Sequence, residues 1–270
     1  MTAASPAPAW PRRGLPAALD LPEGEIQIWA IPLDPPAERV AALARSLTPD
    51  EEARAARFRF DVHRRRYVVG RGVLRELLGA YLRVPPAALR FDYRERGKPD
   101  LAAPWRSSGL AFNLSNSEDL ALAGFVAGGD LGVDVEFLKE MPDLAEIATR
   151  FFSAAEVAAL AGVPAERKKE AFFNCWTRKE AYLKAVGVGL AAPLDSFAVT
   201  LAPGEAPRML TLQGDRERAA GWFFRHLEPR PQFLGAVAIE RPMPAGSAEP
   251  RVVAWTYEPG ASLDASTPAG

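Results

Sequence analysis

Two short stretches of this chain carry residues that could do chemistry together. In GVDVE, Asp134 and Glu136 alternate with valines, so in a strand both carboxylates point to one face. In WTRKEAYLKAVGVGL, Glu180 and Lys184 stand four positions apart, which places them on one face of a helix. Magnesium takes oxygen ligands and is usually shared with substrate phosphates. Three carboxylates and a lysine that converged would therefore suit a divalent cation and a phosphate.

Each stretch also has an ordinary structural interpretation. Asp134 and Glu136 fit the solvent face of an amphipathic strand, and Glu180 with Lys184 fits an exposed ion pair that contributes a few tenths of a kcal/mol. The neighbouring residues are mostly apolar or aromatic in both stretches. A charged group in such a buried setting needs a partner, so the flanking sequence favours the functional interpretation.

Arginines gather in one segment. Residues 53–75 hold eight arginines and one acid, a sum of +7, in a chain whose net charge is −1. Such a cluster indicates an anionic partner, and it fits a solvated face, a nucleic-acid footprint or a phosphate clamp. The overall pI near 6.2 weakens the nucleic-acid alternative. The arginines stand at positions 54, 57, 59, 64, 65, 66, 71 and 75.

Cysteine and histidine usage narrows the class of protein further. The one cysteine, Cys175, excludes intrachain disulfides, and with two histidines it argues against structural zinc. Cys175 lies beside Trp176 without a histidine nearby in sequence, which favours a buried small residue over a nucleophile. The N-terminal sequence lacks the continuous apolar core of a signal peptide or membrane span. We therefore expect a cytoplasmic protein that does not enter a membrane.

The chain contains a weak internal repeat with an offset of 105 residues. Thr48 with Glu51 forms a capping box, and the shift carries it onto a second one at Ser153 with Glu156. The same shift maps Ile28, Leu33, Tyr67 and Val68 onto Val133, Leu138, Phe172 and Phe173. Chance similarity between two common units is the alternative. The repeat predicts an α+β fold of two similar α/β halves about a pseudo-twofold axis, with the active site in the cleft between them.

The expected organisation follows from this repeat. A flexible N-terminal tail covers residues 1–23 and a flexible C-terminal tail covers 258–270. Between them, residues 24–128 form a half that holds phosphate or nucleotide, and residues 129–257 form a half with the metal and catalytic residues. The first half is expected to contain a strand at 25–33, helices at 37–47 and 48–83, a strand at 89–93 and two strands within 112–126. The second is expected to contain strands within 130–144, 196–201, 221–229 and 233–240, and helices after Ser153 and around Glu180.

With these residues in view, the sequence resembles a known family. GVDVE, RFFSAAE and FFNCWTRKEAYLKAVGVGLAAPLDSFAV follow, in order and spacing, the signature of 4′-phosphopantetheinyl transferases of the larger, pseudo-dimeric type typified by the surfactin-synthetase activator. The likeness extends more weakly to GKPDL, FNLSNS and VGRGVLRELL, and so covers about residues 25–240. The resemblance implies transfer of the phosphopantetheine arm of coenzyme A to a serine of an apo acyl or peptidyl carrier protein, with release of adenosine 3′,5′-bisphosphate.

The resemblance also assigns roles by position. Asp134, Glu136 and Glu180 match three magnesium ligands, and Asp134, Glu180 and Lys184 match catalytic positions. Glu180, or a water that it orients, would be the base for the acceptor serine, and Lys184 would contact the pyrophosphate. Coenzyme A would contact residues that the family places around its nucleotide and phosphates. These are Lys98 and Pro99 of the GKP loop, Ser115, Asn116, Lys184, and Arg71 as the best match for the arginine on the 3′-phosphate, with Arg65 and Arg66 as competitors.

One residue departs from the family pattern. The family commonly has histidine after the loop serine, where this chain has Asn116, which donates a hydrogen bond but carries no charge. We expect weaker coenzyme A binding without loss of chemistry. The remaining alternatives are a nucleotide- or nucleic-acid-binding module that uses the arginine cluster, and a metal-dependent coenzyme A pyrophosphate hydrolase. The internal pseudo-dimer predicts a monomer.

Overall fold

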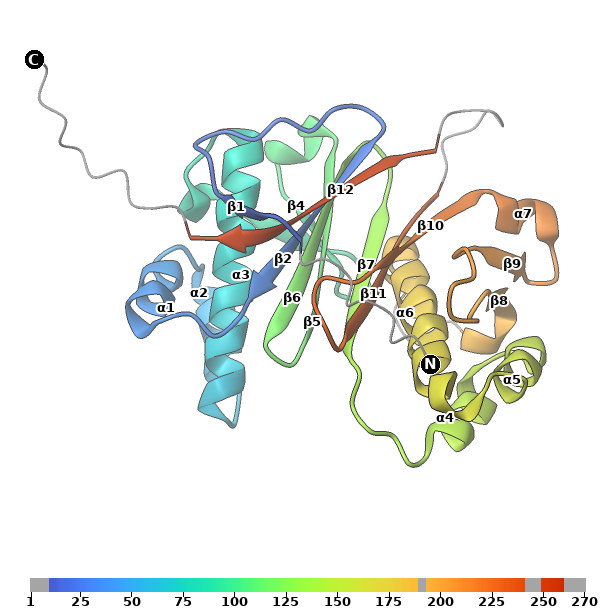
Figure 1. Cartoon of the computed structure of the whole chain (residues 1–270). Coiled ribbons are helices and arrows are strands. Elements are labelled where there is room, and N and C mark those ends of the chain that lie inside the picture. Colours follow the sequence, from blue (N-terminus) through green and yellow to red (C-terminus); the bar gives the residue numbers. More distant parts are fainter. Residues whose placement is uncertain (1–9, 189–192, 241–248, 260–270) are drawn as a thin grey trace, which may run out of the picture.

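The computed structural model describes residues 10–188, 193–240 and 249–259. Two β-sheets lie face to face at the centre, and one long helix covers the outer side of each (Figure 1). Helix α3 (Asp61–Leu82) packs on the first sheet, and α6 (Lys168–Val186) packs on the second. The fold is therefore a mixed arrangement of helices and sheets, and the sheets separate its two principal helices.

The first sheet has five strands in the order β1-β12-β2-β6-β5. Trp29 and Ile31 of its strand β2 belong to a core that also contains Leu74 and Leu77 of α3. Helices α1 and α2 accompany α3 on this side (Figure 1). The bounds are β1 Arg12–Gly14, β2 Glu25–Pro32, α1 Ala37–Ala44, α2 Pro49–Ala56, β5 Leu110–Ser117, β6 Leu120–Ala127 and β12 Arg251–Glu258, with a hairpin of β3 Phe91–Tyr93 and β4 Pro99–Leu101.

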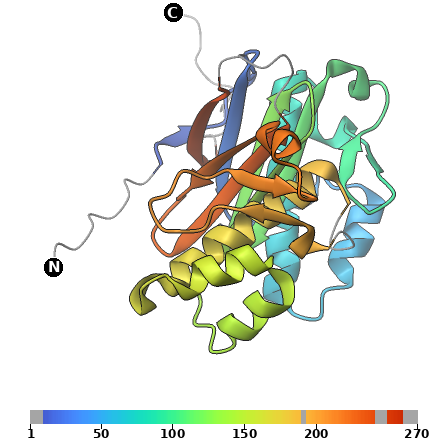
Figure 2. The same cartoon turned by 90° about the vertical axis from the view of Figure 1, so that its right-hand side faces the viewer.

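The second sheet has three strands in the order β10-β11-β7. Figure 2 brings this side forward and shows α4 and α5 in yellow-green below the orange strands β8 and β9. The core under α6 is rich in aromatic rings, with Phe172 stacked on Phe152 and Trp176. The bounds are β7 Leu131–Phe137, α4 Leu144–Phe151, α5 Ala154–Ala161, β8 Phe197–Val199, β9 Met209–Leu212, α7 Arg216–Ala220, β10 Trp222–Leu227 and β11 Phe233–Glu240.

The sheets meet through side chains as well as through an apolar core. Ile28 and Leu122 of the first sheet pack with Val133 and Val237 of the second. Along the line where β5 accompanies β7, the Asn113 side chain accepts a hydrogen bond from the Val133 amide at 2.9 Å. Ser115 and Ser117 continue this row of polar contacts toward Asp134 and Glu136. Asp134 and Glu136 therefore lie along the line between β5 and β7.

Three sequence-based expectations need correction. The helix expected from residue 48 to 83 is two helices, because the chain leaves helical geometry between α2 and α3 at residues 57–60. Residues 10–23 are packed rather than loose: β1 pairs with β12, and buried Leu19 donates its amide to the Ala80 carbonyl at 3.0 Å. Strand β12, placed with the second half and not foreseen as a strand, pairs in parallel with β2 of the first sheet. Residues 1–9 and 260–270 of the expected tails lie outside the described residues.

The other expected elements agree with the structure to within a few residues. Both capping boxes are present, at Thr48 with Glu51 and at Ser153 with Glu156. The turn that ends WTRKEAYLKAVGVGL lies partly outside the described residues. No helix in the described part of the chain is long and apolar enough to cross a membrane.

Candidate active site

The carboxylates are positioned by the close contact between β7 and α6. A Cβ atom on Gly132 would lie 2.0 Å from the Ala181 carbonyl oxygen and 2.3 Å from the Ala185 amide nitrogen. Only glycine lets the strand and helix approach this closely. Asp134 follows two positions later on β7, and on α6 Glu180 directly precedes Ala181 and Lys184 directly precedes Ala185. The contact therefore brings the two sequence stretches together.

Asp134 and Lys184 form an ion pair across this contact. The Lys184 Nζ lies 2.5 Å from the Asp134 Oδ1 and 2.7 Å from the Ser115 Oγ. The Ser115 hydroxyl also lies within hydrogen-bond distance of the same Asp134 oxygen, at 2.9 Å. Asp134 is 3% exposed, and its second oxygen, Oδ2, has no hydrogen-bond partner among the described residues.

Glu136 and Glu180 complete an acidic group around Asp134. Glu136 accepts a hydrogen bond from the Ser117 hydroxyl at 2.8 Å, and the Glu180 Oε1 is buried without a partner in the described chain. Burial raises the pKa of Glu180, and the neighbouring Asp134 carboxylate raises it further. The pKa of Glu136 is raised by the same two causes. The three carboxylates therefore repel one another, and Lys184 supplies only one compensating charge.

A cavity of about 510 Å³ opens onto these side chains. Six of the residues chosen from sequence line it: Ser115, Asn116, Asp134, Glu136, Glu180 and Lys184. The cavity also has walls that sequence reasoning did not assign, formed by Arg150, Phe151, Trp176, Pro193, Leu194 and Asp195. Ser117 was missed as well, although its spacing of two from Ser115 repeats the spacing of Asp134 and Glu136.

The donor set of this cavity suits a hard cation. Two carboxylate oxygens, Asp134 Oδ2 and Glu180 Oε1, are buried without partners in the described chain. Oxygen ligands of this kind are the ones that Mg²⁺ prefers. Within the described residues, however, no three His, Cys, Asp or Glu side chains are arranged so that they could hold a metal ion as they stand. Lys184 occupies one oxygen of Asp134 and Ser117 occupies one oxygen of Glu136, so two oxygens that could bind a cation already have protein partners.

The other residues chosen for coenzyme A lie outside this cavity. Lys98 reaches from the β3–β4 hairpin to the Ala185 carbonyl at 2.9 Å and the Leu131 carbonyl at 3.1 Å, so its ammonium fastens the hairpin to α6 and β7. Burial lowers the pKa of Lys98. Pro99 lies beside it in β4, half-buried.

The three arginines considered for the 3′-phosphate have different surroundings. Arg71 is 6% exposed, and its Nε lies 3.0 Å from the buried Glu51 carboxylate. Arg66 is partly exposed and lies 2.8 Å from Asp34 and 3.6 Å from Glu118. Arg65 is exposed and contacts only a backbone oxygen among the described residues. Arg65 and Arg66 are thus more accessible to an anion than Arg71 is.

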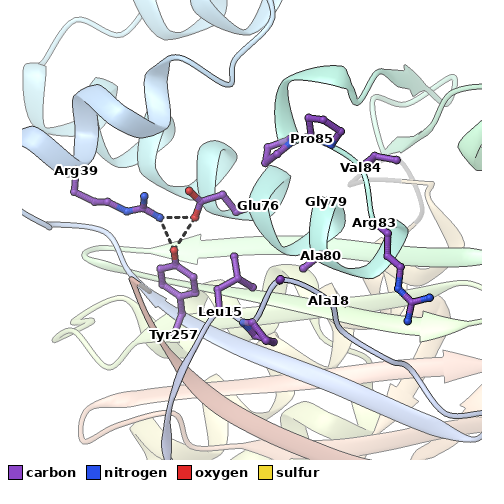
Figure 3. A pocket seen from close by; sticks show the side chains of 13 residues that line it. Leu15, Ala18, Arg39, Glu76, Gly79, Ala80, Arg83, Val84, Pro85 and Tyr257 are labelled. Atoms are coloured by element: carbon purple, nitrogen blue, oxygen red, sulfur yellow. Dashed lines mark hydrogen bonds and ion pairs between the residues drawn. The ribbon is translucent and has the colours of Figure 1, made fainter. Parts of the chain in front are cut away.

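A second cavity, of about 610 Å³, lies between the N-terminal segment and the end of α3. Figure 3 shows Arg39, Glu76 and Tyr257 meeting at one side of it. The Tyr257 hydroxyl donates to the Glu76 carboxylate at 2.7 Å, and Arg39 pairs with the same carboxylate. These charges neutralise one another, and none of the residues lining this cavity lines the carboxylate cavity. Its chemistry offers no group for a transfer reaction.

Cys175 is fully buried, and burial raises the pKa of its thiol well above the usual value. A thiol of this kind is inert. The sequence-based interpretation of Cys175 as a small core residue agrees with this position.

Comparisons with known proteins point to one family. A family model described as the 4′-phosphopantetheinyl transferase superfamily matches residues 130–238, and one described as 4′-phosphopantetheinyl transferase, N-terminal, matches residues 33–126. The 4′-phosphopantetheinyl transferase HetI of Nostoc is 43% identical over 224 residues, which cover 83% of this chain and 91% of that protein. Psf-1 of Bacillus pumilus is 34% identical over 65% of this chain and 75% of its own length, and Sfp of Bacillus subtilis is 30% identical over 57% and 66%.

Proposed function

The chain belongs to the 4′-phosphopantetheinyl transferase superfamily, and from this premise we propose that it moves the phosphopantetheine arm of coenzyme A onto a serine of an apo carrier protein. The observation that carries the proposal is the Asp134, Glu136, Glu180 and Lys184 group in one open cavity. An acidic group with one cation beside it suits a pyrophosphate held through a metal ion.

The reaction transfers phosphorus between two oxygens. The serine Oγ forms a bond to the phosphorus that carries the pantetheine arm, and the bond from that phosphorus to the bridging oxygen breaks. The electron pair stays on the bridging oxygen, which leaves as the 5′-phosphate of adenosine 3′,5′-bisphosphate. Glu180 takes the serine proton, directly or through a water. Lys184 lies 2.5 Å from Asp134 and is placed to donate to the pyrophosphate as charge develops on the leaving oxygen.

Magnesium is the cation that we propose for this group. Asp134, Glu136 and Glu180 would hold it, because two of their oxygens have no partner in the described chain and their mutual repulsion favours a cation. Bound there, it would neutralise charge on the pyrophosphate and keep it aligned. Ser115 and Asn116 line the same cavity and would donate to phosphate oxygens.

For the 3′-phosphate we propose Arg66 ahead of Arg71 and Arg65. Arg66 is partly exposed and pairs with Asp34, and it stands beside Glu118, next to the serine that contacts Glu136. Arg71 is more deeply buried and shares the Glu51 carboxylate with Arg75. The Lys98 ammonium already donates to two backbone carbonyls. Lys98 and Pro99 would therefore act by fixing the conformation of the hairpin beside the nucleotide.

We also propose that the two halves are related by a pseudo-twofold axis. Strand order supports this relation. In β2-β6-β5 and in β7-β11-β10 alike, the strand that comes first in the sequence pairs with the one that comes last, and the middle strand of the sequence lies at the far side. Each half also buries a capping-box glutamate against a basic residue of its long helix, Glu51 with Arg75 and Glu156 with Lys179. An internal pair of this kind favours a monomer.

The test is a mass measurement on intact carrier proteins. The purified chain with Mg²⁺ and coenzyme A is expected to add the phosphopantetheine mass to an acyl or peptidyl carrier protein, and excess EDTA is expected to abolish the addition. No addition across a panel of carrier proteins, with coenzyme A binding verified, would overturn the proposal. Cleavage of coenzyme A at an undiminished rate without any carrier protein would indicate a pyrophosphate hydrolase.

The residue at position 116 is expected to affect the affinity for coenzyme A. The Asn116→His variant is expected to bind coenzyme A about threefold to tenfold more tightly, because a charge-assisted hydrogen bond to phosphate is stronger than a neutral one. The gain should be larger at pH 6 than at pH 8, since an ordinary histidine has a pKa near 6.5 and is charged only at the lower pH. Titration calorimetry with Mg²⁺ measures it, and Asn116→Gln is the uncharged control. Equal affinities of the two variants at pH 6 would contradict the prediction.

A further inference from the structure

The turn between α2 and α3 exposes an unusual set of side chains. We call residues 57–65 the basic–apolar corner. Every residue of this corner is exposed. Phe60 is 56% exposed, and its ring packs against His63 and the Arg59 guanidinium. The corner contains Arg57, Phe58, Arg59, Phe60, Asp61, Val62, His63, Arg64 and Arg65.

Exposed apolar surface is concentrated here. Six large apolar or aromatic side chains are exposed among the described residues, and three of them, Phe58, Phe60 and Val62, belong to the corner. A fourth, Tyr93, lines a cavity of about 650 Å³ together with Phe58 and Arg57. Scattered exposed apolar residues need no explanation, but a group of them rimmed by charge is typical of a protein interaction site.

The charge of the corner is basic and largely unopposed. Its four arginines and one aspartate sum to +3, although the whole chain has a net charge of −1. Arg57 and Arg59 form no ion pair with any residue that the structure describes, and Arg64 pairs only with Asp61 in the same turn. Complementary charge across an interface steers association and selects the partner. The fitting partner is therefore an acidic protein surface that also offers apolar contact.

A series of contacts leads from the corner to Glu136, which lines the carboxylate cavity. Arg66, the residue that follows it, lies 3.6 Å from Glu118, and the neighbouring Ser117 donates to Glu136 at 2.8 Å. A protein that covers the corner and extends along these contacts would reach the cavity where a serine would react. The partner that must reach this cavity in the proposed function is the acceptor.

We propose that the basic–apolar corner is a docking surface for an acidic acceptor protein, with Phe60 as the apolar anchor and Arg59 and Arg64 facing its carboxylates. This inference rests on the proposed function, because it assigns a surface to the acceptor of that reaction. The Phe58 ring centroid lies 5.5 Å from that of Tyr67, whereas Phe60 is the more exposed of the two and suits a contact that a partner completes.

The experiment compares Phe60→Ala and Arg59→Glu with Leu210→Ala and Arg216→Glu, matched changes at exposed second-half positions. Steady-state transfer is measured against an acidic apo carrier protein and, separately, against coenzyme A. Each corner variant is expected to raise the KM for the carrier protein about tenfold, the size of a moderate hot-spot loss, with unchanged kcat and unchanged KM for coenzyme A. Arg59→Glu should also make the carrier KM less sensitive to salt.

Several outcomes would overturn this inference. An unchanged carrier KM in both corner variants would remove the corner from acceptor binding. A raised KM for coenzyme A would assign it to the nucleotide instead, and salt-sensitive binding of RNA or of anionic vesicles, lost in the variants without any effect on transfer, would assign it to another partner. The wild-type chain in the same assay separates the two proposals, because absence of transfer there refutes the function itself. Titration of the carrier protein into wild type and Phe60→Ala still tests the surface in that case.

Discussion

Replacing Glu180 by glutamine is expected to lower kcat for phosphopantetheine transfer by about 100-fold to 10,000-fold, the range for removal of a general base. The amide keeps the shape of the side chain but neither accepts the serine proton nor brings negative charge to a cation. The stability of the folded protein should not fall, because Glu180 is a buried carboxylate beside Asp134 and its neutralisation removes a charge repulsion. In EDTA, the thermal midpoint of Glu180→Gln is expected to equal or exceed that of the wild type.

The control for this experiment is Glu166→Gln, which neutralises an exposed glutamate outside the cavity. Its kcat should match that of the wild type. If Glu180→Gln retained more than about a tenth of the wild-type kcat, Glu180 would be neither the base nor a required ligand, and the role would pass to a water held by the other carboxylates. A large fall in the thermal midpoint would show that the residue stabilises the fold instead.

The charged residues that line the carboxylate cavity could be selected from sequence because they follow local rules. Asp134 and Glu136 share a face by strand alternation, and Glu180 and Lys184 share one by helical spacing. Their convergence depends on Gly132, where β7 and α6 nearly touch, and spacing alone does not predict that contact. The resemblance to a family predicted that the two stretches meet, and the close contact at Gly132 explains how they do.

Other features depended on contacts between distant residues. Strand β12 joins β2 across more than two hundred positions, and nothing within RVVAWTYE indicates which sheet it enters. Arg71 sits in a helical pattern suited to a phosphate contact, and its burial against Glu51 of another helix could not be predicted from that pattern. The helix break at residues 57–60 was missed because arginines are good helix formers, and the turn follows from packing of α2 on α3. Local propensity predicts none of these three features.

The capping boxes were predicted, but their second role was not. Glu156 caps α5 by accepting the Ser153 amide at 2.8 Å, and it also lies 2.8 Å from the Lys179 ammonium and accepts the Val199 amide at 2.8 Å. Glu156 and Lys179 are both 1% exposed. One carboxylate thus joins α5, β8 and α6, and Lys179 directly precedes Glu180. We therefore expect the position of α6, which carries Glu180, to depend on this buried ion pair.

Neutralising Glu156 is expected to cost more stability than any other change considered for this chain. Glu156→Gln leaves the Lys179 ammonium buried without a counter-charge, and breaking a buried ion pair in this way costs about 3–5 kcal/mol in the free energy of unfolding. Urea unfolding measures the loss against Glu166→Gln, whose free energy of unfolding should match that of the wild type. The double variant Glu156→Gln with Lys179→Met removes both charges and should recover part of the loss, because a neutral pair carries no unpaired charge. If the double variant were as unstable as the single one, hydrogen bonds rather than the charge of Glu156 would hold α6 in place: those of Glu156 to Ser153 and Val199, or those of Lys179 to the Leu194 and Phe197 carbonyls.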